Sequence, residues 1–387
     1  MTYRRAVIPA LVGGLLITLL LWWAGSSAQA LQLRGAGGVF DIDSMNELRR
    51  WLAPWSYDPS LPALPALSGA PAGGDPASGA ATRYTDLYRT GMQIRFVVVF
   101  AVFVAGALLL VRRIPPTRGR TPATVLALWA WGPVAGTLAV TLSAPWLIAS
   151  RGNGSYRLLP QLAGVAASSG PVVVFVSLVT ALLTVAVARV TAKGEEPAPR
   201  QSVPPRAARL AASVGTAAIA LSLVVLSYER VAAAIQTSFG GSGLLSDPGD
   251  LLRQWLLLGG WSGPGTAPLG DWLLYRATDA LMLAVVWWAL RLLPGMLTRT
   301  TVPGVVAGAI CATVLGLLVS RLLLTAIDGT VGVWGPVHLF SRLGEGVPAA
   351  VTFGVVAGLA AFVTLRLAQG RRTAGSPEAS DGVSVTE

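Results

Sequence analysis

The sequence predicts an all-α polytopic membrane protein, with eight transmembrane helices arranged as two tandem four-helix repeats. The prediction depends on the composition, on the long apolar stretches and on a phrase that occurs twice. Apolar residues make up 53% of the chain, charged residues only 12%, and the mean hydropathy is +0.63. Because soluble domains carry about 25% charged residues, the solvent for most of this chain is a lipid bilayer.

Eight stretches are predominantly apolar over about the 20 residues that a helix needs to cross a bilayer. They cover residues 6–25, 92–112, 123–148, 160–188, 208–233, 272–292, 303–326 and 347–368. The first stretch also resembles a secretory leader, because basic residues precede it and the small-residue motif Ala28-Gln29-Ala30 follows it. Its apolar run is longer than a typical leader core and ends near Trp22 and Trp23, which favours a retained helix.

The net charge of +11 indicates topology rather than nucleic-acid binding. More than half of the basic residues lie at the N-terminus or in the connections 112–120, 189–209, 291–299 and 366–372, all on one side of the predicted spans. By the positive-inside rule this side is cytoplasmic. We therefore expect a multi-pass plasma-membrane protein with both termini in the cytoplasm, the lipid bilayer as its surroundings and no nucleic-acid partner.

The phrase DSMNELRRWL at residues 43–52 is echoed by DPGDLLRQWL at residues 247–256. Three further landmarks recur in the same order: Tyr88-Arg89 with Tyr275-Arg276, the run from Gly132 with the run from Gly304, and Pro171 to Arg189 with Pro348 to Arg366. The same order of landmarks indicates an internal duplication. An accidental likeness between segments rich in leucine, alanine, glycine and valine is the alternative.

The duplication predicts a first membrane repeat at 1–190, a cytoplasmic linker at 191–206, a second repeat at 207–370 and a disordered tail at 371–387. Four spans are an even number, so both repeats enter the membrane in the same orientation. We expect them to be related by a pseudo-twofold axis along the membrane normal.

Both echoed phrases predict a short amphipathic helix, within the outer loops 31–91 and 236–271. Ser44 and Glu47 form a capping box before the first helix, and Asp247 before Pro248 suits the start of the second. The helices either lie in the membrane interface, with arginines reaching the headgroups, or pack on the bundle. The residues expected at the interface are Trp51, Trp55 and Arg49 in the first helix and Trp255 and Arg253 in the second. The segment 59–81 between the first helix and the next span consists almost entirely of Pro, Ala, Gly and Ser. We expect it to form a flexible loop.

Ionisable side chains inside a span mark candidate sites because they are costly in lipid. Those within the predicted spans are Arg95, Glu229, Arg230, Arg276, Asp279 and Arg321. Arg276 lies one turn before Asp279 and is expected to neutralise it, and Glu229 is expected to pair with Arg321. These groups either snorkel and neutralise one another or line an asymmetric pocket for a substrate or partner.

Few residues are available for enzyme chemistry. The single histidine, His338, and the single cysteine, Cys311, exclude histidine-rich metal sites and Cys/His clusters, and no Walker-type glycine motif is present. We expect neither a metal nor a cofactor. The segment FDIDS, with Asp41 and Asp43 after the first span, resembles polytopic glycosyltransferases that use polyprenyl-linked sugar donors. That resemblance implies a catalytic carboxylate in the first outer loop.

The sequence therefore favours a non-enzymatic scaffold or accessory subunit that engages a partner membrane protein or an envelope component at its outer face. The alternatives are a small-solute permease, with Asp279, Arg276 and Arg321 around an outward-facing site, and the glycosyltransferase.

Overall fold

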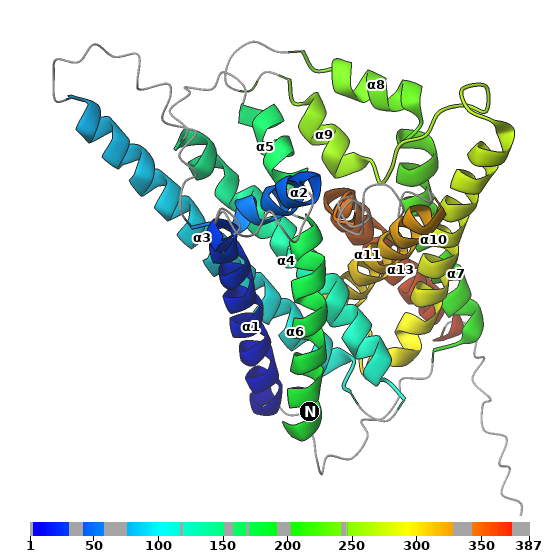
Figure 1. The fold of residues 1–387 in the computed structure, drawn as a ribbon. Helices are drawn as coiled ribbons and strands as arrows, with labels where there is room; N and C mark the ends of the chain where they lie inside the picture. The colour runs from blue at the N-terminus through cyan, green and yellow to red at the C-terminus, as the bar shows by residue number, and fades with distance from the viewer. Residues whose placement is uncertain are drawn as a thin grey trace, which may run out of the picture.

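A computed structural model describes residues 3–30, 42–57, 76–116, 119–150, 158–167, 170–191, 203–240, 245, 247–327 and 343–373 (Figure 1). Within these residues the protein is all-helical, and eight helices are long and apolar enough to cross a membrane. The chain is therefore an integral membrane protein. The eight candidate spans are Ala6–Ser27, Arg83–Arg113, Thr121–Ala149, Gly170–Thr191, Pro205–Leu226, Leu269–Met296, Val302–Ile327 and Val347–Ala368.

The spans belong to longer helices, and short helices lie between them. The elements are α1 (Tyr3–Ala30), α2 (Ile42–Leu52), η2 (Ala53–Trp55), α3 (Pro76–Arg113), α4 (Thr121–Ala149), α5 (Leu158–Ala167), α6 (Gly170–Thr191), α7 (Pro205–Ala220), η4 (Leu221–Leu226), α8 (Glu229–Thr237), α9 (Gly249–Leu256), α10 (Leu269–Met296), α11 (Val302–Ile327) and α13 (Val347–Thr373).

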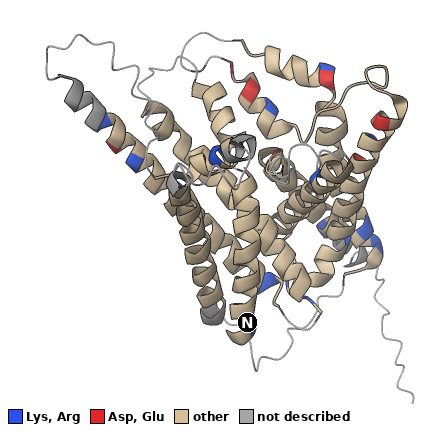
Figure 2. Ribbon diagram, in the orientation of Figure 1, with Lys and Arg blue, Asp and Glu red and all other residues tan. Residues whose placement is uncertain are grey.

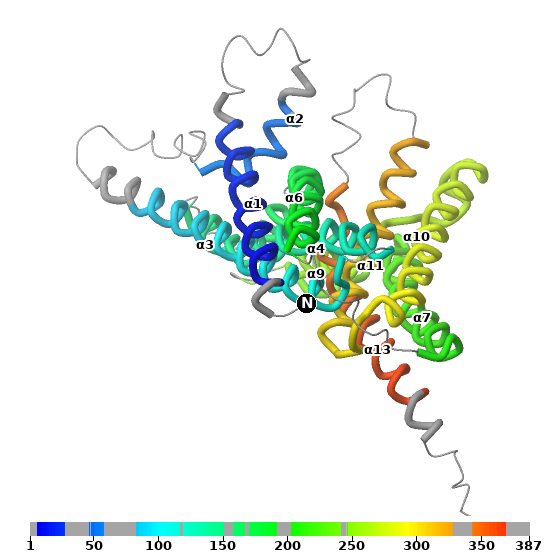
Figure 3. Tube along the Cα trace, turned by 90° about the horizontal axis from the view of Figure 1, so that it is seen from below, coloured from blue at the N-terminus to red at the C-terminus, as the bar shows by residue number. Residues whose placement is uncertain are grey.

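The membrane helices pack as two rings of four (Figure 3). In the first, α1 contacts α3, α3 contacts α4, α4 contacts α6, and α6 returns to α1. In the second, α7, α10, α11 and α13 contact one another in the same order. Glycines allow close packing in both rings: a Cβ at Gly132 of α4 would overlap Ser177 of α6, and one at Gly354 of α13 would lie 2.7 Å from the Ile310 Cα of α11. Each ring thus joins its third and fourth spans through a glycine face.

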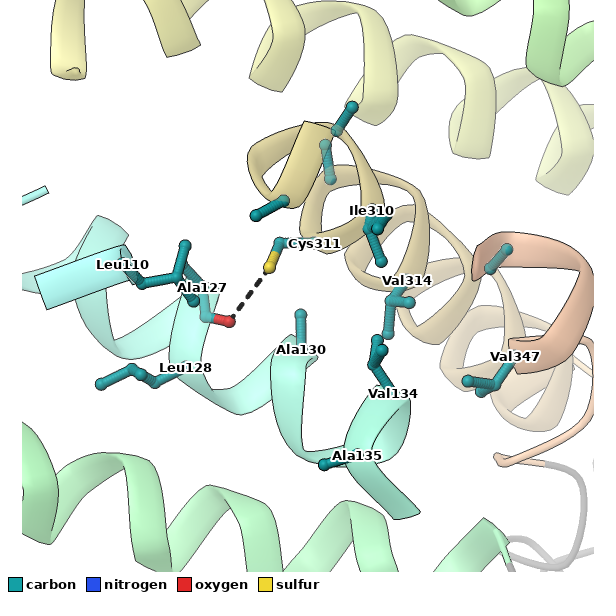
Figure 4. Close-up of a cluster of buried hydrophobic side chains, with 14 of the residues drawn as sticks. Leu110, Ala127, Leu128, Ala130, Val134, Ala135, Ile310, Cys311, Val314 and Val347 are labelled. Atoms are coloured by element: carbon teal, nitrogen blue, oxygen red, sulfur yellow. Dashed lines mark hydrogen bonds between the residues drawn. The ribbon is translucent and has the colours of Figure 1, made fainter. Parts of the chain in front are cut away.

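The rings meet along α4 and α11, which lie at the centre of the molecule (Figure 3). In this interface the Cys311 thiol of α11 donates a hydrogen bond to the Ala127 carbonyl of α4, 3.3 Å away, within a cluster of buried apolar side chains (Figure 4). At one end of the interface the Thr298 backbone amide donates to the Arg113 carbonyl at 3.0 Å. At the other end, Gly170 and Gly344 approach so closely that a Cβ on either would overlap the Cα of the other.

The two ends of the bundle differ in structure and charge. One end carries α2, α5, α8 and α9, and we call it the loop-helix end (Figure 1). Every acidic side chain that the structure describes lies at this end: Asp86, Glu229, Asp247, Asp250, Asp271, Asp279 and Glu345 (Figure 2). The opposite end, which we call the basic end, carries Arg112, Arg113, Arg120, Arg189, Arg206, Arg209, Arg291, Arg299 and Arg366.

The predicted fourth span, 160–188, is wrong as a single helix. The structure has α5 up to Ala167 and α6 from Gly170, and it does not describe the two residues between them. Pro171 at the start of α6 provides the physical reason, since proline lacks an amide hydrogen and disfavours helical backbone in the residue before it. Only α6 is long enough to cross a bilayer, and α5 packs on α4 and α9.

The predicted fifth span, 208–233, is also wrong at its end. The chain passes from α7 into the π-helical segment η4, leaves the helix at Ser227 and Tyr228, and starts the separate α8 at Glu229. Ser227 donates its backbone amide and its hydroxyl to the Ser222 carbonyl, at 3.0 and 2.7 Å, which closes the wide turn. Glu229 and Arg230 therefore lie outside the membrane span, on the exposed side of α8.

The ends of the first two spans also differ from expectation. The helix α1 continues through Ala28-Gln29-Ala30, and Ala6, Ile17 and Leu21 of this helix are fully buried in the first ring. The helix α3 begins at Pro76, so the end of the predicted flexible segment 59–81 is helical.

The two short helices pack on the bundle. Trp51, Leu52 and Trp55 are buried, and α2 contacts α1 and α6. The second helix, α9, contacts α5, α8 and α13, with Trp255 half-buried. Protein side chains therefore cover apolar faces that the interfacial alternative assigns to lipid.

The structure tests the predicted N-terminal cap of α9 but not that of α2. The side chains of Ser44 and Glu47 lie outside the described residues. For α9, the expected cap is wrong: Pro248 occupies the N-cap position, and Asp247 has a positive φ of 55°.

Replacing Gly170 by alanine is expected to destabilise the protein by about 1–3 kcal/mol, because overpacking a tight contact costs that much. Thermal unfolding of the purified chain in mild detergent measures the effect. Gly295→Ala is the matched control, since a Cβ at Gly295 meets nothing within 4 Å. Equal unfolding midpoints for the two variants would contradict a close contact between the rings at Gly170 and Gly344.

Candidate functional site

A buried tryptophan and an arginine meet at the loop-helix end of the first ring. Trp55, the last residue of η2, is fully buried. The Arg95 guanidinium of α3 lies over its indole, with Cζ 5.8 Å from the ring centroid, and Phe96 packs beside it with a centroid separation of 6.2 Å. A Cβ at Gly25 of α1 would overlap the Trp55 carbonyl, so only glycine lets α1 approach this closely. We call Trp55 and Arg95 the first clamp.

Arg95 connects three segments of the first ring. Its Nε donates to the Ser143 hydroxyl of α4 at 2.9 Å, and its Nη1 donates to the Pro54 carbonyl of η2. Only 1% of Arg95 is exposed. A cation placed in an apolar span needs such partners, so the candidate binding residue Arg95 fixes the segment that follows α2.

A second tryptophan and arginine meet at the same end of the second ring. The Arg276 Cζ of α10 lies 4.7 Å from the centroid of the Trp261 ring, and the Tyr228 ring packs against Trp261 with a centroid separation of 4.8 Å. The Trp261 indole donates to the Val224 carbonyl of η4 at 3.0 Å. Backbone hydrogen bonds also join Trp261 to Ser227 at 3.1 Å and to Glu229 at 2.8 Å. The segment after α9 is thereby fixed to the π-helical end of the fifth span.

The second arginine has an acidic partner. Arg276 Nη1 lies 2.7 Å from Asp279 Oδ2, so the expected ion pair is present. We call Trp261, Arg276 and Asp279 the second clamp. The expected pair between Glu229 and Arg321 is wrong, because Arg321 faces Glu345 at 3.9 Å and Glu229 is exposed on α8. The reason is the early end of the fifth span, which carries Glu229 away from α11.

The candidate binding residues thus fall into three places. Arg276, Asp279 and Arg321 gather at the loop-helix end of α10 and α11, where Arg321 is close enough to Asp279 to interact electrostatically. Arg95 lies in the other ring, and Glu229 lies on α8. The two ion pairs balance their charges, and their four side chains remain between 18% and 51% exposed.

The candidate interface residues on the short helices either contact protein or are exposed. Arg49 is exposed on α2. Arg253 of α9 donates from Nη1 to the Gln236 Oε1 of α8 at 2.8 Å, and the amide nitrogen of Gln236 donates to Asp250 Oδ1 at 2.7 Å. These exposed hydrogen bonds hold α8 and α9 together, so Arg253 serves contacts between the two helices.

Two Trp-Ser dipeptides position the clamps, a role that was not predicted from the sequence. Trp55-Ser56 and Trp261-Ser262 each follow one copy of the echoed phrase within a few residues. The Ser56 carbonyl accepts a hydrogen bond from the Tyr88 hydroxyl at 2.7 Å. The Ser262 carbonyl accepts one from the Trp272 indole at 3.0 Å. In each ring, an aromatic side chain of the second span thus binds the residue after the clamp tryptophan.

The described residues contain no group of three or more histidine, cysteine, aspartate or glutamate side chains placed to hold a metal ion. Cys311 is buried between the rings. His338 and Asp41 lie outside the described residues, as does the side chain of Asp43.

Searches against protein-family models, curated proteins and solved structures return no match for this chain.

Replacing Trp55 by alanine is expected to cost about 3–5 kcal/mol of stability, as for other buried tryptophans. Thermal unfolding in detergent provides the measurement. Trp288→Ala, at a position 61% exposed on α10, should leave the midpoint nearly unchanged. A Trp55 variant as stable as the Trp288 variant would contradict the anchoring role of the first clamp.

Proposed function

We propose that this integral membrane protein is a non-enzymatic scaffold or accessory subunit, which engages a partner membrane protein or an envelope component at its loop-helix end. The proposal rests on one observation: the charged side chains within the spans bind residues of the protein itself. Arg95 holds η2, Arg276 is stacked on Trp261 and paired with Asp279, and Arg321 faces Glu345. These groups fix the connecting segments and thereby give the loop-helix end a defined shape.

We further propose that the two rings are repeats with parallel orientation, related by a pseudo-twofold axis. Three observations support it. The helices of the two rings contact one another in the same order. The third span of one ring packs on the third span of the other, as a twofold interface requires of equivalent elements. Each ring also carries a tryptophan after its echoed phrase that packs against an arginine of the ring's second span, although the two arginines are not at equivalent positions of the echo.

Orientation follows from charge. The described acidic side chains all lie at the loop-helix end, and the basic end carries arginines alone among its described charged residues. The positive-inside rule then assigns the basic end, and with it both termini, to the cytoplasm of a plasma-membrane protein. The loop-helix end would face outward, where the partner is found.

A small-solute permease is the second candidate. It is favoured by the clustering of Arg276, Asp279 and Arg321 on neighbouring helices, with about a fifth of each side chain exposed. A solute with its own charged groups would exchange with these ion pairs.

Affinity purification in mild detergent is expected to recover a stoichiometric companion with the wild-type chain. Reversing the exposed charges of α8, Glu229→Arg with Arg230→Glu, should weaken the association roughly tenfold, about 1.4 kcal/mol. Arg299→Glu at the basic end is the matched control and should leave the companion bound. Purification of the wild-type chain without any companion would overturn the proposal that it is a scaffold.

The variant Asp279→Asn separates the two candidates. A scaffold should keep its companion in this variant, whereas a permease should lose solute uptake because the site's carboxylate is gone. Uptake in proteoliposomes that depends on Asp279 would establish the permease instead.

A further inference from the structure

The two clamps differ in how their arginines are neutralised. Arg276 has the carboxylate of Asp279 at 2.7 Å. Arg95 bonds to the Ser143 hydroxyl and the Pro54 carbonyl, which are both neutral, and forms no ion pair with a described carboxylate. The first clamp therefore holds an uncompensated positive charge in a site that is almost wholly buried.

Two hydrogen-bond donors of the first clamp also find no acceptor among the described residues. These are Nη2 of Arg95 and Nε1 of Trp55. The side chains are adjacent, with the guanidinium 5.8 Å from the indole centroid, and they are 1% and 0% exposed. Buried donors are nearly always paired in folded proteins. An unpaired N–H of the buried guanidinium, next to an unpaired indole N–H, therefore indicates a ligand.

The neighbouring hydroxyl groups have already donated their hydrogens. The Ser143 hydroxyl donates to the Val140 carbonyl at 3.1 Å, and the Tyr88 hydroxyl donates to the Ser56 carbonyl at 2.7 Å. What remains at the first clamp is a positive charge with free N–H donors. This chemistry selects an anion over a cation, and over water, which needs acceptors as well as donors.

We propose that the first clamp binds a small monovalent anion of the halide class, held by Arg95 Nη2 and Trp55 Nε1. A single negative charge balances the single guanidinium. A monatomic ion needs the least room, which matters because both side chains are sealed within the protein. The ion thereby does for the first ring what Asp279 does for the second.

The sequence echo shows that the charges of the two rings are not duplicated, because it aligns Arg95 with Met282 and Arg276 with Arg89. Met92, one turn before Arg95 and 1% exposed, occupies the position that corresponds to Asp279. The first ring thus has a thioether where the second has a carboxylate. The proposal concerns the first ring alone and is independent of any partner at the loop-helix end.

The test compares unfolding temperatures of the full-length protein in chloride and in gluconate, at equal ionic strength and in the same detergent. The wild type should unfold roughly 2 to 4 °C higher in chloride, as binding to the folded state requires. Arg95→Gln should abolish this difference. Met92→Asp should also abolish it, because the new carboxylate takes the place of the ion. Arg253→Gln, an exposed arginine on α9, is the matched control and should keep the wild-type difference.

Equal unfolding temperatures in the two salts would overturn the proposal, and so would a Met92→Asp protein that keeps the full chloride response. A third outcome would also overturn the proposal: phosphatidylglycerol raises the unfolding temperature in a way that requires Arg95, while halide has no effect. The site would then bind a lipid headgroup. Crystals of the wild type grown with bromide give a direct readout if the variants fail to fold. An anomalous peak beside Arg95 Nη2 is expected, and its absence would refute the site.

Discussion

A charged side chain inside a membrane span has to find partners within the protein, and much of the loop-helix end follows from that constraint. Lipid supplies neither counter-ions nor hydrogen bonds, so each buried ionisable group must be compensated locally. In the first ring, Arg95 reaches a backbone carbonyl of η2 and a hydroxyl of α4. In the second, Arg276 is held by Asp279 and stacked on Trp261. The hydrogen bonds of Arg95 and the ion pair of Arg276 offset the cost of burying each cation, and the same contacts fix a connecting segment.

Close backbone contact plays the corresponding role for the apolar part of the fold. Helices in a bilayer gain little from hydrophobic burial against one another, since lipid tails are equally apolar, and so depend on tight packing. Gly132 in the first ring and Gly354 in the second bring neighbouring spans together, and Gly170 meets Gly344 where the rings join. Glycine in these places is a requirement of packing, whereas Gly295 has open space around it.

Sequence reasoning found the spans because hydropathy over some twenty residues is a strong signal, and it located the Arg276–Asp279 pair because the partners lie one helical turn apart. It failed where structure depends on contacts distant in sequence. The partner of Arg321 lies in the connection before α13, and those of Arg95 are a carbonyl and a hydroxyl, which leave no charge pattern to recognise. The predicted fourth and fifth spans also extended past the helix breaks at Pro171 and Ser227, because a break within an apolar stretch barely changes the hydropathy averaged over some twenty residues. Nor does amphipathic spacing distinguish a tryptophan that faces lipid from one, such as Trp55, that faces protein.

The π-helical segment Leu221–Leu226 has a consequence for the geometry of the second ring. A π turn accommodates one residue more than the surrounding α-helix, and each α-helical residue turns the chain by about 100°. If the same six residues adopted ordinary α-helical geometry, without the wider turn, Ser227 and Tyr228 would be rotated by about that angle around the axis of α7. Both would then face away from Trp261. The extra residue in this turn thus sets the rotational phase at which the fifth span presents its end to the clamp.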